Sequence, residues 1–169
     1  MQQAARKAKS YSGEQKPLTL SVIIPCYNEV DTLEAVLERV IDVGLANEII
    51  IVDDASRDRS VGVAEVLAAR HPEVRLLRHE KNQGKGAALR TGFRVARGDF
   101  VAVQDADLEY NPLELKELLV PLQRGDADVV LRPVLLDPVR CAQHVARQAR
   151  ARIVEHVQRD NVRARRGAR

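Results

Sequence analysis

Apolar runs alternate along the chain with segments in which apolar residues recur every three or four positions. The runs predict five buried strands, at residues 18–25, 48–54, 74–77, 100–104 and 127–131. The segments between them predict four helices, at residues 30–43, 61–70, 85–96 and 113–124. Strands that alternate with helices through short connections are typical of an α/β protein. Such a protein has a mostly parallel sheet with helices on both faces.

Polar residues follow three of the predicted strands, at the point where each strand ends. They are Tyr27, Asn28 and Glu29, then Asp53 and Asp54, and finally the segment from Asp105 to Glu109. The carboxyl ends of parallel strands meet at one edge of a sheet, and ligands bind at that edge. The sequence therefore predicts one acidic ligand site there.

The segment from residue 105 to residue 109 places carboxylates at alternate positions, Asp105, Asp107 and Glu109. Carboxylates this close raise one another's pKa unless a positive charge lies between them. Mg²⁺ or Mn²⁺ is suited to this place, because each takes oxygen ligands and leaves positions open for phosphate groups. The alternative is a solvated acidic turn before the helix that Asn111 and Pro112 begin. The residues alone leave both interpretations open.

Length and composition predict one soluble domain. The chain has 169 residues, of which 45% are hydrophobic and 30% charged. No apolar run approaches the roughly 18 residues that span a bilayer, and residues 1–16 lack the apolar segment of a signal peptide. Cys26 and Cys141 lie far apart without metal-ligand spacing, so we expect reduced thiols in a cytoplasmic protein. The four histidines are scattered along the sequence, so we expect them to have surface or capping roles.

Composition and charge together divide the chain into three parts. They are a polar leader predicted to be disordered (1–17), a domain (18–131) and a basic tail (132–169). Residues 1–131 have 17 Lys and Arg against 21 Asp and Glu, a net charge of −4. Residues 132–169 have 10 Arg, no Lys and three acidic residues, a net charge of +7. A nucleic-acid-binding domain would need a basic face, so the acidic body disfavours that function.

The tail has apolar residues at four-residue spacing between residues 142 and 157, which predicts a basic helix. Its abrupt change of composition suggests a truncated or altered end. The alternative is a natural basic tail that binds anionic lipid or a partner. The sequence does not decide between them.

Four segments occur in an order and spacing that resemble a known family. They are Ser21 to Glu29, Glu48 to Asp58, Asn82 to Gly92 and Gln104 to Glu109. Together they resemble the inverting nucleotide-sugar glycosyltransferases, and especially the dolichyl- and polyprenyl-phosphate mannosyltransferases and glucosyltransferases. The resemblance covers about residues 18–131. It implies the GT-A fold, a Rossmann-like architecture, here apparently truncated after the half that contains the Asp-x-Asp motif.

The resemblance also implies roles for particular residues. The implied nucleotide contacts are Pro25, Tyr27, Glu29, Val52 and Asp54. Asp105, Ala106 and Asp107 would form the Asp-x-Asp motif, whose carboxylates act in catalysis and hold Mg²⁺ or Mn²⁺, with Glu109 as a third ligand.

Each role has a simpler alternative. Asp53 or Asp54 could be a cap beside Ser56, Tyr27 a packing residue, and Glu29 an anion near a helix N-terminus. Lys85 is either a donor contact or a solvated lysine at the start of a helix.

The function that the resemblance implies is metal-dependent sugar transfer, with inversion, from GDP-mannose or a UDP-sugar to a polyprenyl phosphate. We therefore expect a cytoplasmic protein, at most peripheral at the cytosolic face of a membrane. The resemblance ends after Leu131, so the acceptor half cannot be located. One alternative is a catalytically incomplete nucleotide-binding or interaction module. A nucleotidyltransferase is disfavoured because Cys26 to Glu29 stands where its Gly-rich loop would be.

Overall fold

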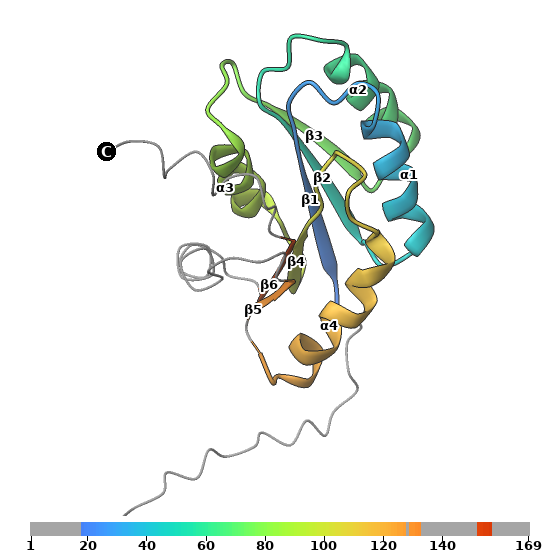
Figure 1. Ribbon diagram of the computed structural model, residues 1–169, viewed down its shortest axis with the longest axis vertical. Helices are drawn as coiled ribbons and strands as arrows, with labels where there is room; N and C mark the ends of the chain where they lie inside the picture. Colours follow the sequence, from blue (N-terminus) through green and yellow to red (C-terminus); the bar gives the residue numbers. More distant parts are fainter. Residues whose placement is uncertain (1–17, 128, 133–151, 157–169) are drawn as a thin grey trace, which may run out of the picture.

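The computed structural model describes residues 18–127, 129–132 and 152–156. Within these residues all strands are parallel and form one sheet in the order β3-β2-β1-β4-β6-β5 (Figure 1). The strands are β1 (Leu20–Cys26), β2 (Glu48–Asp53), β3 (Val74–Arg78), β4 (Phe100–Val103), β5 (Val129–Arg132) and β6 (Arg152–His156). The helices are α1 (Leu33–Val43), α2 (Ser60–Arg70), α3 (Lys85–Val95), the short 3₁₀ helix η1 (Pro112–Glu114) and α4 (Leu115–Arg124).

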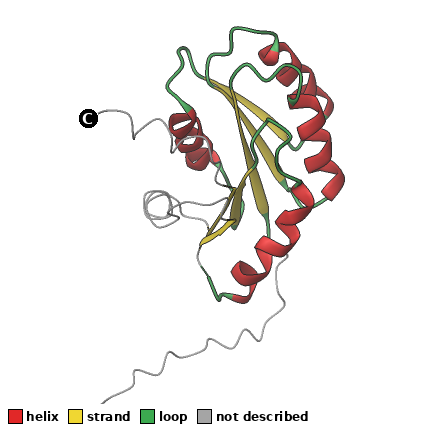
Figure 2. Ribbon diagram, in the orientation of Figure 1, coloured by secondary structure: helices red, strands yellow, loops and turns green. Residues whose placement is uncertain are grey.

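Helices cover both faces of the sheet, as the sequence predicted. α1, α2 and α4 lie on one face and α3 on the other (Figures 1 and 2). Alternate residues of β1 divide between the two cores: Val22 and Ile24 pack under the three helices, and Ile23 packs under α3. These strand residues are fully buried, which explains why the strands are continuous apolar runs.

A close contact sets the position of α3. A Cβ atom added to Gly92 would lie 2.6 Å from Cγ2 of Ile23. Only a glycine allows the helix backbone to approach β1 this closely. The approach brings the first residue of α3 to the edge at which the parallel strands end.

The first helix begins later than predicted. α1 starts at Leu33, and the carbonyl of Glu29 accepts hydrogen bonds from the backbone N–H groups of Thr32 and Leu33. The helix ends as expected at Gly44, whose φ of 66° is the left-handed conformation that favours glycine.

The structure corrects the interpretation of one part of the tail. Arg152–His156 is strand β6, so the helix predicted over residues 142–157 is wrong for these five residues. β6 lies between β4 and β5, with Phe100 opposite Arg152 and Val129 opposite Ile153. Backbone pairing with two neighbouring strands outweighs the weak helical periodicity of a short segment. The rest of that predicted helix, the leader and Cys141 lie outside the described residues.

No helix in the described ranges is long and apolar enough to cross a membrane.

Candidate active site

A cavity of about 400 Å³ opens at the carboxyl edge of the sheet. Its walls come from the ends of β1, β2 and β4 and from the start of α3. The lining residues are Pro25, Cys26, Tyr27, Glu29, Asp54, Asn82, Gly84, Lys85, Ala88, Asp105, Ala106 and Asp107. The structure therefore brings together the predicted site residues, except for Val52 and Glu109.

Val52 and Glu109 lie outside the cavity wall for different reasons. The Val52 side chain is fully buried in the core beneath α3 and does not line the cavity. Glu109 is exposed beyond the wall, and its backbone N–H donates to Oδ1 of Asp107 at 3.2 Å. All three residues of the Asp-x-Asp motif thus line the cavity, but the predicted third metal ligand does not.

Asp54 anchors the loop that joins β3 to α3. Its carboxylate accepts hydrogen bonds from the backbone N–H groups of Gln83, at 3.0 Å, and Gly84, at 2.6 Å. Nδ1 of His79 lies 2.6 Å from its Oδ1. Burial disfavours the ionised form, but the hydrogen bonds from His79, Gln83 and Gly84 outweigh it and lower the Asp54 pKa. Asp54 is therefore an ionised, buried anchor at the cavity wall.

His79 was expected at the surface or in a capping role, but its side chain is only 9% exposed and contacts Asp54. Its Nε2 lies 2.9 Å from Oγ1 of Thr91, so the ring connects the end of β2 to α3 through Asp54. A sequence signal for this pair exists: Asp54 and His79 each directly follow a strand, and Asp53 pairs with Arg78 in the register of β2 and β3. Two residues that follow paired parallel strands in register are neighbours.

Asp53 has the local role that one of the two aspartates was expected to take. Its Oδ2 accepts from the backbone N–H of Ser56 at 3.2 Å, which stabilises the turn after β2. The side chain is buried and does not line the cavity.

Hydrogen bonds from a buried side chain fix the loop after β4, which carries Asp105 and Asp107 at the cavity wall. Gln104 is fully buried, and its Nε2 donates to the carbonyls of Asp105 at 3.2 Å and Tyr110 at 3.4 Å. Leu108 has a φ of 63°, a conformation that a non-glycine residue rarely adopts. Such outliers concentrate at functional sites, where the surrounding structure maintains them.

Lys85 contacts the first aspartate of the motif. Its Nζ lies 2.7 Å from the carboxylate oxygens of Asp105, which is 4% exposed. Burial raises the Asp105 pKa; Lys85 opposes this shift, while Asp107 and Glu109 add to it. Sequence reasoning left Lys85 undecided, because the two residues are 20 positions apart.

Glu29 belongs to the same field of negative charge. Its pKa is raised, first by burial and then by the charges of Asp107 and Asp105, whereas a hydrogen bond from Thr32 opposes the shift. The acidic side chains from β1 and β4 therefore influence one another, and a cation that binds among them would stabilise the ionised forms.

Hydrogen bonds between the loops after β1 and β2 hold Tyr27 at the cavity mouth. The backbone N–H of Asn28 donates to Oγ of Ser56 at 3.0 Å, and that of Arg57 donates to Oδ1 of Asn28 at 2.8 Å. Glu29 donates its backbone N–H to Oγ of Ser60 at 2.8 Å. Tyr27 is 40% exposed and presents an aromatic surface to a ligand.

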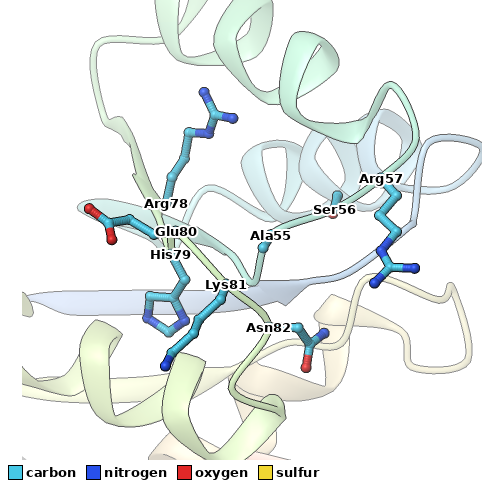
Figure 3. Close-up of a pocket in the computed structure, with 8 residues that line it drawn as sticks. All are labelled: Ala55, Ser56, Arg57, Arg78, His79, Glu80, Lys81 and Asn82. Atoms are coloured by element: carbon cyan, nitrogen blue, oxygen red, sulfur yellow. The ribbon is translucent and has the colours of Figure 1, made fainter.

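A second cavity of about 650 Å³ adjoins the first, because Asn82 lines both. It lies between residues 55–57 and 78–82 (Figure 3). Arg57, His79 and Lys81 are among its lining residues, and Figure 3 shows Arg78 directed towards α2. There Nη1 of Arg78 lies 3.6 Å from Oε1 of Glu65. The second cavity thus has more basic side chains than the first.

The residue pattern matches a known family over most of the chain. Residues 21–159 match the family described as "Glycosyl transferase family 2". The chain belongs to glycosyl transferase family 2. This confirms the resemblance noted in the sequence, and the match extends past β6.

Relatives and solved structures agree with that assignment. The chain is 38% identical over 110 residues to a dolichol-phosphate mannosyltransferase of Pyrococcus furiosus, covering 64% of this chain and 31% of the relative. It is 39% identical over 111 residues to the undecaprenyl-phosphate 4-deoxy-4-formamido-L-arabinose transferase of Pseudomonas aeruginosa, covering 63% and 33%. The chain thus spans about a third of the length of these relatives.

A mannosyltransferase from Pyrobaculum calidifontis, solved with GDP-Man and Mn²⁺, shares the fold with a TM-score of 0.55. The two are 29% identical, and the match covers 61% of this chain and 31% of the mannosyltransferase. The predicted GT-A architecture is therefore confirmed.

Proposed function

We propose that this chain binds the nucleoside diphosphate of a sugar donor together with a divalent metal, as the donor-binding part of a glycosyltransferase. The proposal rests on the cavity of about 400 Å³, where Glu29, Asp105 and Asp107 gather at the ends of parallel strands. The mannosyltransferase solved with GDP-Man and Mn²⁺ supports this ligand class. GDP-mannose and UDP-sugars are the donors to test.

The donor atoms of this cavity suit Mg²⁺ or Mn²⁺. They are carboxylate oxygens, which hard divalent cations prefer. In the parts of the chain that the structure describes, no three His, Cys, Asp or Glu side chains surround a common metal position. A metal bound by one or two carboxylates completes its coordination with phosphate oxygens. We therefore assign it to Asp107 with Asp105, and to a diphosphate that binds with it.

The proposed reaction is inverting sugar transfer to a polyprenyl phosphate. The relatives named for dolichol phosphate and undecaprenyl phosphate support this acceptor class. An acceptor phosphate oxygen would form a bond to the anomeric carbon as the bond from that carbon to the diphosphate breaks. The acceptor is already an anion, so no protein base is required. A bound metal would neutralise the charge that develops on the departing diphosphate.

The cavity residues have distinct tasks in this proposal. Tyr27 offers a face for the nucleobase, and Asp54 holds the 79–84 loop in place through its contacts with His79, Gln83 and Gly84. A lipid acceptor would place the protein at the cytosolic face of a membrane.

Calorimetric titration with GDP, UDP and GDP-mannose, in Mn²⁺ and in EDTA, tests the proposal. We expect binding that Mn²⁺ strengthens, and we expect Asp107→Ala to remove that strengthening while the far-UV circular dichroism stays unchanged. Asp42→Ala changes an exposed acid on α1 and serves as the control. A folded Asp107→Ala protein that keeps the full Mn²⁺ effect would refute the metal assignment.

A catalytically incomplete nucleotide-binding module is the second candidate, because the described cavity gathers the residues proposed to bind the donor and the metal. Transfer of labelled mannose from GDP-mannose to a polyprenyl phosphate separates the two. Binding without transfer favours the module, and transfer favours the enzyme.

A further inference from the structure

Lys85 occupies a fixed position at the junction of the cavity and the start of α3. It is the first residue of that helix, and Gly84 before it has a φ of 84°. The backbone N–H of Gly84 is held by Oδ2 of Asp54 at 2.6 Å. The anchor described above therefore determines where the Lys85 side chain begins.

The charges that line the cavity make Lys85 distinctive. Among its described lining residues, Glu29, Asp54, Asp105 and Asp107 are acidic, and Lys85 is the one lysine or arginine. Asp54 is ionised, but its carboxylate oxygens already accept hydrogen bonds from the loop backbone and contact His79. Most charged side chains that line this cavity would repel a diphosphate. Among the described lining residues, the Lys85 ammonium is the lysine or arginine group that would attract it.

The geometry leaves the ammonium group available to a ligand. The Lys85 side chain is 36% exposed, whereas that of Asp105 is 5% exposed. The carboxylate thus holds the ammonium from the buried side, while the other side of the group faces the cavity. An ammonium has three N–H donors, so its contact with Asp105 leaves donor capacity for a phosphate oxygen. The N-terminus of α3, where Lys85 lies, also favours an anion.

We propose that Lys85, oriented by Asp105, binds the diphosphate of the nucleotide directly and independently of the metal. The inference rests on the proposed function and assigns separate parts of the nucleotide affinity to the metal and to Lys85. The metal at Asp107 and Asp105 accounts for the metal-dependent part of the affinity. Lys85 accounts for a separate phosphate contact, and the nucleoside is bound by other residues.

The test compares wild type, Lys85→Met, Lys85→Arg and Lys81→Met. Lys81 is an exposed lysine on the preceding loop that lines only the second cavity, so Lys81→Met is the matched control. Calorimetry measures guanosine, GDP and inorganic pyrophosphate binding in Mn²⁺ and in EDTA. The signal of free Mn²⁺ in electron paramagnetic resonance measures metal affinity without nucleotide, and circular dichroism checks the fold.

Lys85→Met should weaken GDP and pyrophosphate binding by roughly tenfold to a hundredfold, the range for a lost hydrogen bond to a charged group. Guanosine affinity should stay within about twofold, because the nucleoside does not contact an ammonium that binds phosphate. Mn²⁺ affinity without nucleotide should stay equal or rise, since a positive charge beside the carboxylates is removed. Lys85→Arg should keep much of the affinity, and Lys81→Met should match wild type.

Two outcomes would overturn the inference. Wild-type affinity for GDP and pyrophosphate in a folded Lys85→Met protein would show that the lysine makes no phosphate contact. A loss of Mn²⁺ affinity that accounts for the whole loss of GDP affinity would show that Lys85 acts only through the metal site. If wild type itself binds no nucleotide in Mn²⁺, the proposed function fails instead, and pyrophosphate binding still tests Lys85.

Discussion

Replacing Asp54 with asparagine tests whether a buried carboxylate holds the wall between the two cavities. The Asp54 side chain is 3% exposed and receives hydrogen bonds from the backbone N–H groups of Gln83 and Gly84 and from His79. Asparagine has almost the same shape but only one accepting oxygen. Its NH₂ group would face a hydrogen-bond donor of the protein, so at least one of these contacts must be lost.

The expected cost follows from the number and kind of contacts. A hydrogen bond to a charged group contributes about 1.5–3 kcal/mol, and an unsatisfied buried donor adds its own desolvation penalty. We therefore expect Asp54→Asn to lower the free energy of unfolding by about 2–4 kcal/mol at pH 7. Nucleotide affinity should fall as well, because the 79–84 loop lines both cavities.

Urea unfolding followed by far-UV circular dichroism measures the effect, with Asp31→Asn as an exposed control. The pH dependence gives a second check. The pKa of Asp54 is lowered in the folded state, so its stabilising contribution is complete above the unfolded value of about 3.9 and is lost as the pH falls through the folded value. The difference between wild type and Asp54→Asn should be constant from about pH 7 to pH 5 and shrink below about pH 4.

Either of two results would refute this reasoning. The first is a free energy of unfolding for Asp54→Asn within about 0.5 kcal/mol of wild type, the usual range for surface substitutions. The second is a difference that stays unchanged at acid pH. In both cases the carboxylate would not be the anchor that the contacts indicate.

Three further predictions concern the rest of the fold. Gly92→Ala should lower the free energy of unfolding by about 1–3 kcal/mol, because its Cβ would lie 2.6 Å from Ile23; an unchanged urea midpoint would argue against the tight packing of α3. Cys26 is buried, and burial raises the pKa of its thiol to about 11, so peptide mass spectrometry should find it unmodified by iodoacetamide at pH 8 until urea unfolds the chain. Deleting residues 138–169 removes β6, the partner of both β4 and β5, and should lower the urea midpoint; an equal midpoint would contradict that pairing.

Local sequence pattern alone predicted the order of strands and helices as far as β5, and the edge of the sheet at which the ligand site lies. Both depend on local pattern: apolar runs identify buried strands, and residues that follow parallel strands must meet at one edge. That reasoning placed Tyr27, Glu29 and Asp54 on the same cavity as Asp105 and Asp107, and the structure agrees. The order and spacing of the motifs also indicated the family, which the comparisons confirm.

The tertiary structure decided the features that depend on contacts between distant parts of the chain. The contact between Lys85 and Asp105 joins residues 20 positions apart, and that between His79 and Asp54 joins residues 25 apart. The position of β6 between two earlier strands depends on which strand edges are open, whereas the spacing of its apolar residues favoured a helix. The periodicity of apolar residues indicates only on which face of its own helix or strand a residue lies. Which residue pairs with a buried charge, and which strand pairs with an open edge, depends on contacts across the whole sheet. These contacts form because an unpaired buried polar group is costly in free energy.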